Sequence, residues 1–332
     1  MLDVASFQAA ADRIHSKIRR TPLVRLRAGN VPVGGGIDAH GIVDVPTIGD
    51  RLGHDLLLKL ECLQVSGSFK ARGALNKVLG LPKEQAARGI VTASGGNHGL
   101  AVAYAGRSIG VPTTVFLPRL TPEPKAQRIA RWGAKVERAG DVWDDAHAAA
   151  LAFAEREGQA YIHPFADPAV VAGQGTIALE VLADAPDVDA FVVAIGGGGL
   201  AAGVAQAAKL LRPSIRIIGV EPVGAPTLHE SLRAGEVIEL PEITTKAGTL
   251  APRKSDAFNV EIIGRTVDTI VLVTDDEMRD AARFLLTEAG VGAELSGAAA
   301  VAAVLAGRAD LAGTKHPCAL VCGAGSDALS PA

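Results

Sequence analysis

The stretch Ser66-Gly-Ser-Phe-Lys-Ala-Arg-Gly-Ala74 decides the fold that we expect for this chain. The small residues at positions 66–68 permit a tight backbone turn, and Lys70 then stands directly before the start of a helix rich in alanine and glycine. A lysine held in this way can point its amine into a cleft. Most lysines are solvated surface residues, so the setting of Lys70 needs support from other parts of the chain.

Two further segments follow apolar runs and precede helix-like stretches. Gly196-Gly-Gly-Gly199-Leu200 can bring backbone N–H groups and a helix N-terminus to one point, which suits a phosphate. Ser94-Gly-Gly-Asn-His-Gly99 exposes N–H groups at a second helix start, which suits a carboxylate, and the Asn97 amide can donate to a ring oxygen. Taken singly, the first segment could be a plain glycine turn and the second a helix cap.

Together these segments resemble the fold-type II pyridoxal-phosphate (PLP) enzymes, specifically the serine/threonine dehydratase and serine racemase group. The resemblance extends from about Arg20 to Asp327, and the family string G-S-F-K-x-R-G-A is matched in full from Gly67 to Ala74. It implies that Lys70 forms a Schiff base with PLP, which acts as an electron sink.

The same resemblance assigns roles to the remaining residues of these segments. It implies that the cofactor is bound by Phe69, Lys70, Asn97, Gly196, Gly197, Gly198, Gly199, Leu200 and Cys322. It also implies that the carboxylate of the substrate docks on Ser94, Gly95, Asn97 and His98.

Position 95 departs from the racemases of this family. In those enzymes the residue before Gly-Asn-His is a serine that works as a second acid/base on the face opposite the lysine, whereas this chain has Gly95. Inversion of the α-carbon needs an acid/base group on each face, and a chain with Gly95 lacks the one opposite the lysine. Gly95 therefore favours elimination over racemisation. Ser94 lies one position too early to replace the missing serine.

Cys322 is expected beside the pyridine nitrogen of the cofactor, because alignment on the apolar strand before it places it where the family has serine, threonine or cysteine. A neutral thiol cannot protonate that nitrogen fully, so the electron sink is moderated, which suits loss of a β-leaving group and discourages transamination. A buried structural cysteine is the alternative interpretation, and Ser326 is the second candidate for the role.

Apolar runs of strand length alternate with alanine-rich stretches, which predicts an α/β fold with parallel strands buried on both faces and joined by helices. Strands are expected at Leu56–Leu60, Ile90–Ala93, Thr113–Leu117, Lys135–Arg138, Ala190–Ile195, Arg216–Val220 and Cys318–Val321. Helices are expected at His98–Ile109, Pro124–Trp132, Asp144–Glu157, Leu200–Leu211 and Asp276–Glu288, and a long loop or flap at Ala28–Val45.

The resemblance implies the tryptophan synthase β-like architecture, with two domains of open twisted sheets flanked by helices. A large PLP-binding domain would comprise residues 1–81 and 165–332, and a small domain of residues 82–164 would be inserted into it. The cleft between the two would hold the cofactor, as is general for open α/β sheets.

Composition narrows the classes of partner. Hydrophobic residues make up 48% of the 332 residues and charged residues 21%, which is typical of globular proteins. A net charge of -3 without a basic block argues against a nucleic-acid or membrane partner and favours a small-molecule partner. The resemblance implies that this partner is an amino-acid substrate. No long apolar run or leader is apparent, so we expect a cytoplasmic protein, and the resemblance suggests a homodimer.

Neither a disulfide framework nor a metal site is expected. Cys62, Cys318 and Cys322 lack metal-binding or disulfide spacing, so we interpret them as reduced thiols. Glu221 lies where metal-dependent relatives have an acidic cluster, but no second carboxylate follows it closely, and hard cations require several oxygen ligands.

The function expected from these residues is PLP-dependent α,β-elimination of a β-hydroxy amino acid, such as L-threonine or L-serine, to a 2-oxo acid and ammonia. A serine racemase of the same family is the alternative, and a catalytically silent PLP-binding protein is a third possibility. A more distant alternative is an NAD-binding Rossmann enzyme, since Gly196 and Gly198 follow a strand and Glu221 follows the next. However, the third glycine position falls on Ala201, and this alternative leaves the Lys70 segment unexplained.

Overall fold

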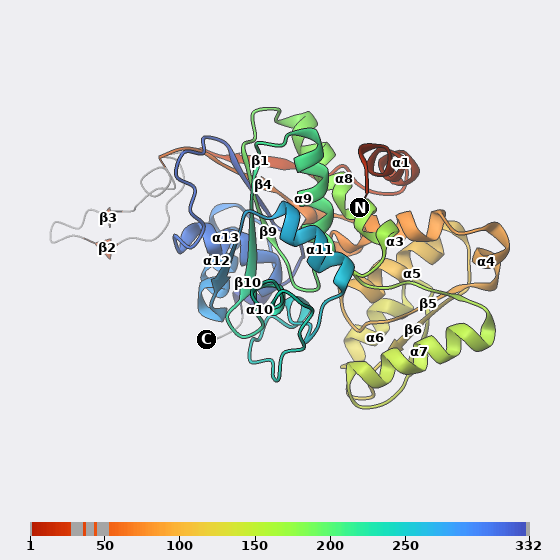
Figure 1. Cartoon of the computed structure of the whole chain (residues 1–332). Coiled ribbons are helices and arrows are strands. Elements are labelled where there is room, and N and C mark those ends of the chain that lie inside the picture. Colours follow the sequence, from red (N-terminus) through yellow and green to blue (C-terminus); the bar gives the residue numbers. More distant parts are fainter. Residues whose placement is uncertain (1, 28–35, 38–42, 45–52, 330–332) are drawn as a thin grey trace. The chain divides into compact units, whose positions relative to one another are not determined.

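The computed structural model describes residues 2–27, 36–37, 43–44 and 53–329 (Figure 1), so most of the predicted loop at 28–45 lies outside the described residues. The chain divides into two compact units. The first unit contains residues 21–63 and 177–332, and the second contains residues 2–20 and 64–176. The predicted domain boundaries after residues 81 and 164 stay a prediction; the compact units divide instead after residues 63 and 176.

The first unit is built on a six-stranded sheet. Its strand order is β1 (Leu23–Leu26), β4 (Leu56–Lys59), β12 (Pro317–Leu320), β9 (Ala190–Ala194), β10 (Arg216–Pro222) and β11 (Thr269–Val273). The pair β1 and β4 is antiparallel, and the other neighbouring pairs are parallel. The residues of β9 are all buried, as expected for a central strand covered on both faces.

Helices cover both faces of this sheet. Figure 1 shows α12 (Asp275–Glu288) and α13 (Leu295–Leu305) on one side, and α9 (Gly199–Leu211) and α11 (Ala257–Thr266) on the other. Ten of the eleven residues of α13 are buried, and their small side chains allow the helix to lie close to the strands. This unit also contains η1 (Glu61–Leu63), α10 (Thr227–Ala234), η3 (Gly248–Leu250), η4 (Asp327–Leu329) and the short antiparallel pair β2 (Gly36–Ile37) and β3 (Val43–Asp44).

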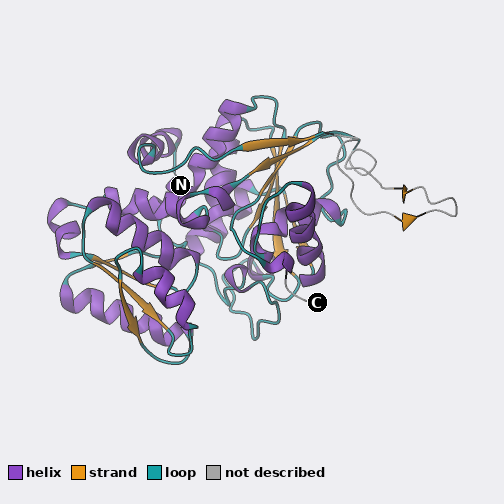
Figure 2. Ribbon diagram, turned by 180° about the vertical axis from the view of Figure 1, so that it is seen from behind, coloured by secondary structure: helices purple, strands orange, loops and turns teal. Residues whose placement is uncertain are grey.

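The second unit has a parallel four-stranded sheet in the order β7 (Lys135–Arg138), β6 (Thr113–Leu117), β5 (Ile90–Ala93) and β8 (Ala160–Tyr161). Figure 2 shows helices on both sides of these strands. They are α5 (Asn97–Ile109) and α6 (Glu123–Ala130) on one side and α7 (Trp143–Glu157) on the other. The unit also contains α1 (Val4–Ile14), η2 (Val65–Gly67), α3 (Lys70–Leu79) and α4 (Lys83–Arg88), and α8 (Pro168–Asp184) begins in it.

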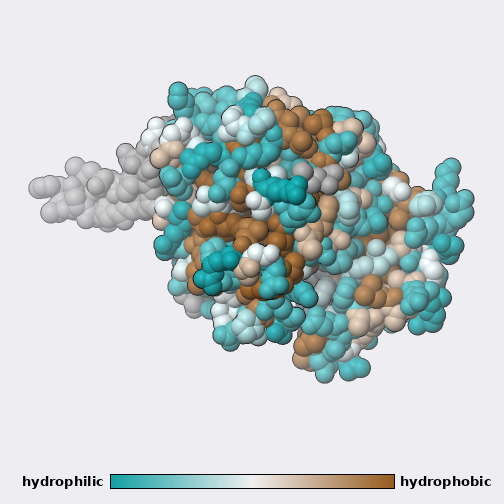
Figure 3. Space-filling model, viewed as in Figure 1, coloured by the Kyte–Doolittle hydropathy of each residue, from teal (hydrophilic) through white to brown (hydrophobic). Residues whose placement is uncertain are grey.

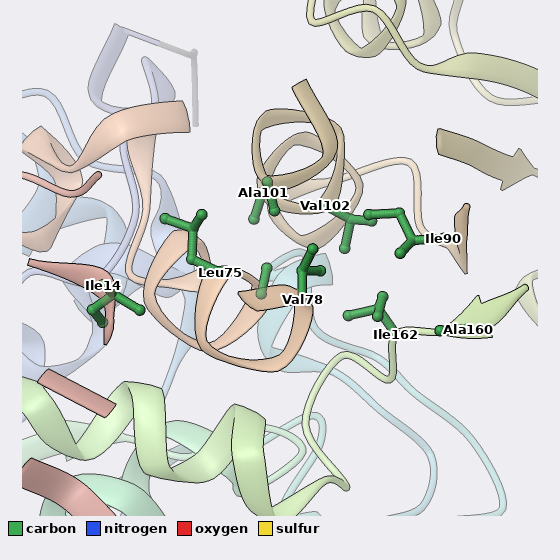
Figure 4. Packing of buried hydrophobic residues seen from close by; sticks show 10 residues of the cluster. Ile14, Leu75, Val78, Ile90, Ala101, Val102, Ala160 and Ile162 are labelled. Atoms are coloured by element: carbon green, nitrogen blue, oxygen red, sulfur yellow. The ribbon is translucent and has the colours of Figure 1, made fainter. Parts of the chain in front are cut away.

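The two-residue alternation of a strand explains how β5 packs on both faces. Val91 and Ala93 contact the alanines of α7, whereas Ile90 points to the opposite side. There it joins an apolar cluster with side chains from α1, α3 and α5 and from the β8 region (Figure 4). This cluster includes Leu75 and Val78 and therefore fixes the orientation of α3, the helix that begins at Lys70.

The predicted strands and helices are confirmed to within two residues at each end. Strands β1, β2, β3, β8 and β11 were not predicted. β2 and β3 lie within the loop expected at Ala28–Val45, β8 has only two residues, and β1 and β11 include exposed or half-exposed positions that interrupt a buried apolar run. All three cysteines are free and buried, as expected for reduced thiols. Within the described part of the chain, no helix is both long enough and apolar enough to cross a membrane.

A buried ion pair in the first unit gives a test of the fold. Lys59 Nζ lies 2.6 Å from Glu180 Oε2 and donates to Thr21 O at 2.8 Å, and the Lys59 side chain has no exposed surface. We expect Glu180→Ala to lower the free energy of unfolding by about 3 kcal/mol or more, because a buried ammonium group loses its counter-charge. Urea denaturation measures this change.

The matched control for this prediction is Glu261→Ala. Its partner Arg265 is 3.1 Å away and both side chains are more than half exposed, so we expect a loss below about 1 kcal/mol. Equal losses from the two substitutions would contradict the importance of the buried pair.

Candidate active site

Lys70 is the first residue of α3 and follows a tight turn. Ser66, with φ of 63°, and Gly67, with φ of 87°, both have a left-handed backbone, which reverses the chain before the helix. Lys70 Nζ donates to the carbonyl oxygen of Pro164 at 2.7 Å and lies 5.1 Å from the centroid of the Phe69 ring. The amine of this half-buried side chain is therefore held at one place.

Two buried hydroxyl groups lie immediately before Lys70. Ser66 Oγ and Ser68 Oγ have no hydrogen-bond partner among the described residues, and Ser68 has no exposed surface. A buried polar atom without a partner costs about 1–3 kcal/mol, so such atoms are rare outside places that bind a ligand or water. The turn before Lys70 thus has unused capacity to bind a polar group.

The arginine and the second glycine of the Lys70 stretch fix α3 against the first part of α8. A Cβ atom at Gly73 would lie 2.7 Å from Val170 O, and one at Gly173 would lie 2.6 Å from the Cα of Gly73. Arg72 is fully buried and donates from Nη1 to Thr176 Oγ1 at 3.1 Å. Since only glycine permits this close approach, these residues determine where the Lys70 side chain starts.

The turn after β5 connects that strand to α5. Gly96 N donates to Ser94 Oγ at 3.3 Å, and α5 begins at Asn97. A Cβ at Gly99 would lie 2.1 Å from Ser94 O, so the last glycine of this segment is needed for the carbonyl to fit against the helix. The first backbone N–H groups of an α-helix have no partner within it, so this helix start can bind an anion.

His98 is anchored to the same backbone segment as Lys70. Its Nε2 lies 2.9 Å from Ile162 O, which requires this nitrogen to donate, and its buried Nδ1 has no partner in the described part of the chain. Burial, followed by the positive charge of Lys70, lowers the pKa of His98 to about 3. The imidazole is therefore neutral, and its Nδ1 lone pair can accept a hydrogen bond.

The titration of His98 follows from this environment. We expect its NMR signals to show no protonation step between pH 5 and pH 8, because the folded-state pKa lies near 3. The native state gains stability from the neutral ring above the unfolded pKa of about 6.5, and this gain is lost as the pH falls toward 3.

The signals of His98 are assigned by their loss in a His98→Asn variant, and the spectra are recorded from pH 5 to pH 8. A His98 step in that range would contradict the buried, Ile162-bound geometry.

The glycine loop of the first unit lies between β9 and α9. Gly196 has φ of 58° and Gly198 has φ of 92°, conformations that residues with a side chain rarely adopt. A Cβ at Gly198 would also lie 2.9 Å from the Cβ of Asn259. Gly196 and Gly198 are thus required by their backbone conformation, and Gly198 is also required because a Cβ there would collide with Asn259.

Hydrogen bonds orient the peptide groups of this loop. Gly197 O accepts from Ser255 Oγ at 3.1 Å and from Asn259 Nδ2 at 2.9 Å. The N–H groups of Gly199 and Leu200 belong to the first turn of α9, where a helix provides no acceptor. With the carbonyl bound on one side and N–H groups available at the helix start, the loop suits an anion such as phosphate.

Cys322 follows β12, which is parallel and adjacent to β9, so Cys322 and the glycine loop lie at the same edge of the sheet. The thiol is 4% exposed and its Sγ lies 3.5 Å from Ser296 O. A Cβ at Gly297 would lie 2.1 Å from Gly323 O, which explains the glycine that follows Ser296. Ser326, the second candidate, is exposed.

The side-chain carboxyl group of Glu221 accepts hydrogen bonds from the protein backbone. Its two oxygens accept from the backbone N–H groups of Leu228 and His229, at 2.9 and 2.8 Å, at the start of α10. Burial raises the pKa of this group to about 8, and the two hydrogen bonds oppose that rise. Among the residues with described positions, no three His, Cys, Asp or Glu side chains are grouped as metal ligands.

The family described as "pyridoxal-phosphate dependent enzyme" matches residues 15–323. The chain belongs to this PLP-dependent enzyme family. The assignment confirms the resemblance drawn from the Lys70 stretch, the α/β fold of the tryptophan synthase β-like type and the cofactor, and it leaves no support for the NAD-binding alternative.

The chain is similar to proteins that are named as L-threonine ammonia-lyase, serine racemase and threonine deaminase. An L-threonine ammonia-lyase of Geobacter sulfurreducens is 40% identical over 96% of this chain and 75% of that protein, and a serine racemase of Arabidopsis thaliana is 38% identical over 91% of this chain and 86% of that protein. The solved structure of threonine deaminase isoform 2 from Solanum lycopersicum is 32% identical, with a TM-score of 0.85 over 97% of this chain and 85% of that one.

The donor groups of the two units fit PLP. In the second unit, the primary amine of Lys70 lies beside two buried hydroxyl groups that have no hydrogen-bond partner among the described residues. In the first unit, the glycine loop leaves a space that a Cβ atom would fill. An amine and an anion-binding loop are the groups that an aldehyde cofactor with a phosphate requires.

The predicted site residues divide between the two units. The second unit contains Phe69, Lys70, Ser94, Gly95, Asn97 and His98, and the first contains Gly196–Leu200 and Cys322. Sequence reasoning did not single out Ser68, which belongs to the matched string, or Asn259, which no motif marked. The roles of all these residues in PLP chemistry stay predictions.

The glycine cradle can be tested by substitution. We expect Gly198→Ala to weaken PLP binding about ten-fold or more, because the new methyl group meets Asn259 and displaces the loop. Equilibrium titration of the cofactor-free protein with PLP, followed by fluorescence, measures the affinity.

The control is Gly235→Ala. Gly235 has a similar left-handed φ of 74°, but nothing lies within 4 Å of the Cβ position, so backbone strain arises without the collision. Equal PLP affinity in the two variants would argue against the loop as the phosphate site.

Proposed function

We propose that this chain catalyses PLP-dependent α,β-elimination of a β-hydroxy amino acid such as L-threonine or L-serine, giving a 2-oxo acid and ammonia. The observation that supports this proposal most is the fixed amine of Lys70, which shares its anchoring segment, residues 162–164, with His98 of the Ser94–Gly99 turn. The L-threonine ammonia-lyase similarity supports the same reaction.

Each group of residues has a separate task in this proposal. Lys70 and Phe69 would hold the aldehyde end of PLP, the N–H groups of the Gly196–Leu200 loop would hold its phosphate, and Asn97 and Cys322 would hold its ring. PLP supplies the electron sink that makes the α-proton of an amino acid removable. The helix start at residues 94–98 binds the substrate carboxylate.

The chain's own residues then move the protons. With its Nζ free, Lys70 would be the base that removes the α-proton of the substrate. The β-hydroxyl group takes up a proton and leaves as water, and water later hydrolyses the enamine product, so the net reaction converts threonine to 2-oxobutanoate and ammonia. The neutral His98 can accept a hydrogen bond but does not add a second positive charge beside Lys70.

Serine racemisation is the second candidate, supported by the similarity to serine racemases. Gly95 argues against it, because residue 95 has no side chain to deliver a proton to the face opposite Lys70. A neutral Cys322 thiol held at the ring nitrogen would also fit elimination, since a moderated electron sink favours rapid expulsion of a β-leaving group.

Substrate turnover tests the proposal directly. We expect the PLP-loaded protein to release a 2-oxo acid and ammonia from at least one of L-threonine, L-serine, 3-hydroxyaspartate and phenylserine, and Lys70→Ala to lower the rate by at least about a thousand-fold. Lys83→Ala, which removes an exposed lysine of α4, is the matched control and should retain the rate. Absence of 2-oxo acid from all four substrates would refute elimination.

Chiral analysis of serine recovered from the same reaction separates the two candidates. Elimination without inversion leaves only L-serine. Accumulation of D-serine faster than pyruvate would assign the chain as a racemase and would show that Gly95 does not prevent inversion.

We also propose that the chain acts as a cytoplasmic homodimer. Figure 3 shows an apolar area on the face of the first unit that it draws, and β11 is an edge strand whose Ile270, Val271 and Leu272 are half-buried. Partly exposed apolar side chains along a sheet edge favour association with a second copy. Light scattering should give twice the chain mass of 34.0 kDa; the mass of a single chain would contradict the dimer.

A further inference from the structure

Thr121 lies against the turn that we assign to the substrate carboxylate. It belongs to the loop after β6, and Gly95 belongs to the turn after β5; the two strands are parallel neighbours, so both loops leave the same edge of the sheet. A Cβ atom at Gly95 would lie 3.1 Å from Thr121 Cγ2 and 3.5 Å from Thr121 Oγ1. The threonine side chain therefore closes the space beside Gly95.

The absence of a side chain at position 95 is not required by the backbone. Gly95 is not among the glycines with a left-handed φ, in contrast to Gly196 and Gly198. Space is the constraint, because a Cβ contact of 3.1 Å requires Thr121 to shift by a few tenths of an ångström, and the Leu117 Cδ2 atom lies 3.7 Å away on another side. The space beside the turn therefore holds the Thr121 side chain but has little room for a side chain at position 95.

Backbone hydrogen bonds fix Thr121, and no hydrogen bond among the described residues uses its hydroxyl group. Thr121 N donates to Pro118 O at 3.0 Å, and Thr121 O accepts from Arg138 Nη1 at 2.9 Å. Arg138 also donates to Arg119 O at 2.9 Å and to Glu123 Oε2 at 2.8 Å, so one guanidinium group ties both ends of the loop. The side chain is only partly buried, which leaves the hydroxyl accessible to a small molecule at the turn.

We propose that Thr121 is a substrate-binding residue of this site: its side chain fills the space beside Gly95, and its hydroxyl donates a hydrogen bond to the carboxylate of an amino acid bound at residues 94–98. The proposal rests on the function proposed above, in which that turn binds the substrate carboxylate. The methyl group of Thr121 forms the wall of the turn, and the hydroxyl adds a neutral donor to the N–H groups of the α5 start.

Two conservative substitutions separate the hydroxyl from the methyl group. In the PLP-loaded enzyme, Thr121→Val keeps the shape and loses the donor, so KM should rise about ten-fold while kcat stays within about three-fold, because a hydrogen bond to a charged group is lost equally in ground and transition states. Thr121→Ser keeps the donor, and its KM should stay within about three-fold of the original value.

A binding measurement keeps this test separate from turnover. L-Alanine has no β-leaving group, so its dissociation constant can be measured from the change in cofactor absorbance without reaction. Thr121→Val should weaken L-alanine binding about ten-fold, and Thr121→Ser should not. If the protein binds L-alanine in this pattern but releases no 2-oxo acid from any substrate, the proposed elimination fails while the role of Thr121 stands.

A swap variant tests whether positions 95 and 121 share one place. Thr121→Ala combined with Gly95→Ser returns a hydroxyl from the other loop and should bind L-alanine more tightly than Thr121→Ala alone. Thr287→Val is the control for the chemical change, because the exposed Thr287 hydroxyl donates to Arg283 O within α12.

The proposal would be overturned by unchanged L-alanine binding in Thr121→Val, by binding in Thr121→Ser as weak as in Thr121→Val, or by no L-alanine binding by the PLP-loaded protein that retains Lys70. Equally weakened L-alanine binding in Thr287→Val would show that the effect does not depend on the position of Thr121.

Discussion

The close contact between α3 and α8 at Gly73 and Gly173 is the constraint on which the candidate site depends. A methyl group on either glycine would overlap backbone atoms, and the contact is completed by the buried guanidinium group of Arg72. Because α3 begins at Lys70, this packing fixes the base of the lysine side chain before any ligand is considered. The apolar cluster around Leu75 and Val78 then prevents rotation of the helix.

The segment 162–164 links the lysine to the turn at residues 94–99. Its carbonyl groups accept from Lys70 Nζ and His98 Nε2, so one stretch of backbone positions a cation and a neutral imidazole in the same unit. The positive charge of Lys70 adds to burial in keeping the pKa of His98 low. A preorganised amine beside a neutral acceptor is suited to proton transfer at an amino acid, since the base needs no competing positive charge nearby.

The sequence was sufficient for the buried strands and for the motifs, because these have local signals: apolar runs in β5 and β9, and glycines flanking Lys70 and α9. It was insufficient for β1, β8 and β11, whose residues are exposed or few in number. It also could not reveal the relation between Gly95 and Thr121, which are 26 positions apart and meet only because β5 and β6 are neighbours. The contact of Gly73 with α8 also depends on the tertiary structure, so the sequence could not reveal it, although Gly73 itself belongs to the matched string.

The central claim is that Lys70 alone binds PLP covalently. Borohydride reduction of the PLP-loaded protein, followed by proteolysis and mass spectrometry, measures this directly, because reduction makes the lysine link permanent. We predict a phosphopyridoxyl group on the peptide that contains Lys70 and on no other lysine peptide in stoichiometric amount. Stoichiometric labelling of a different lysine, with Lys70 unmodified, would contradict this claim.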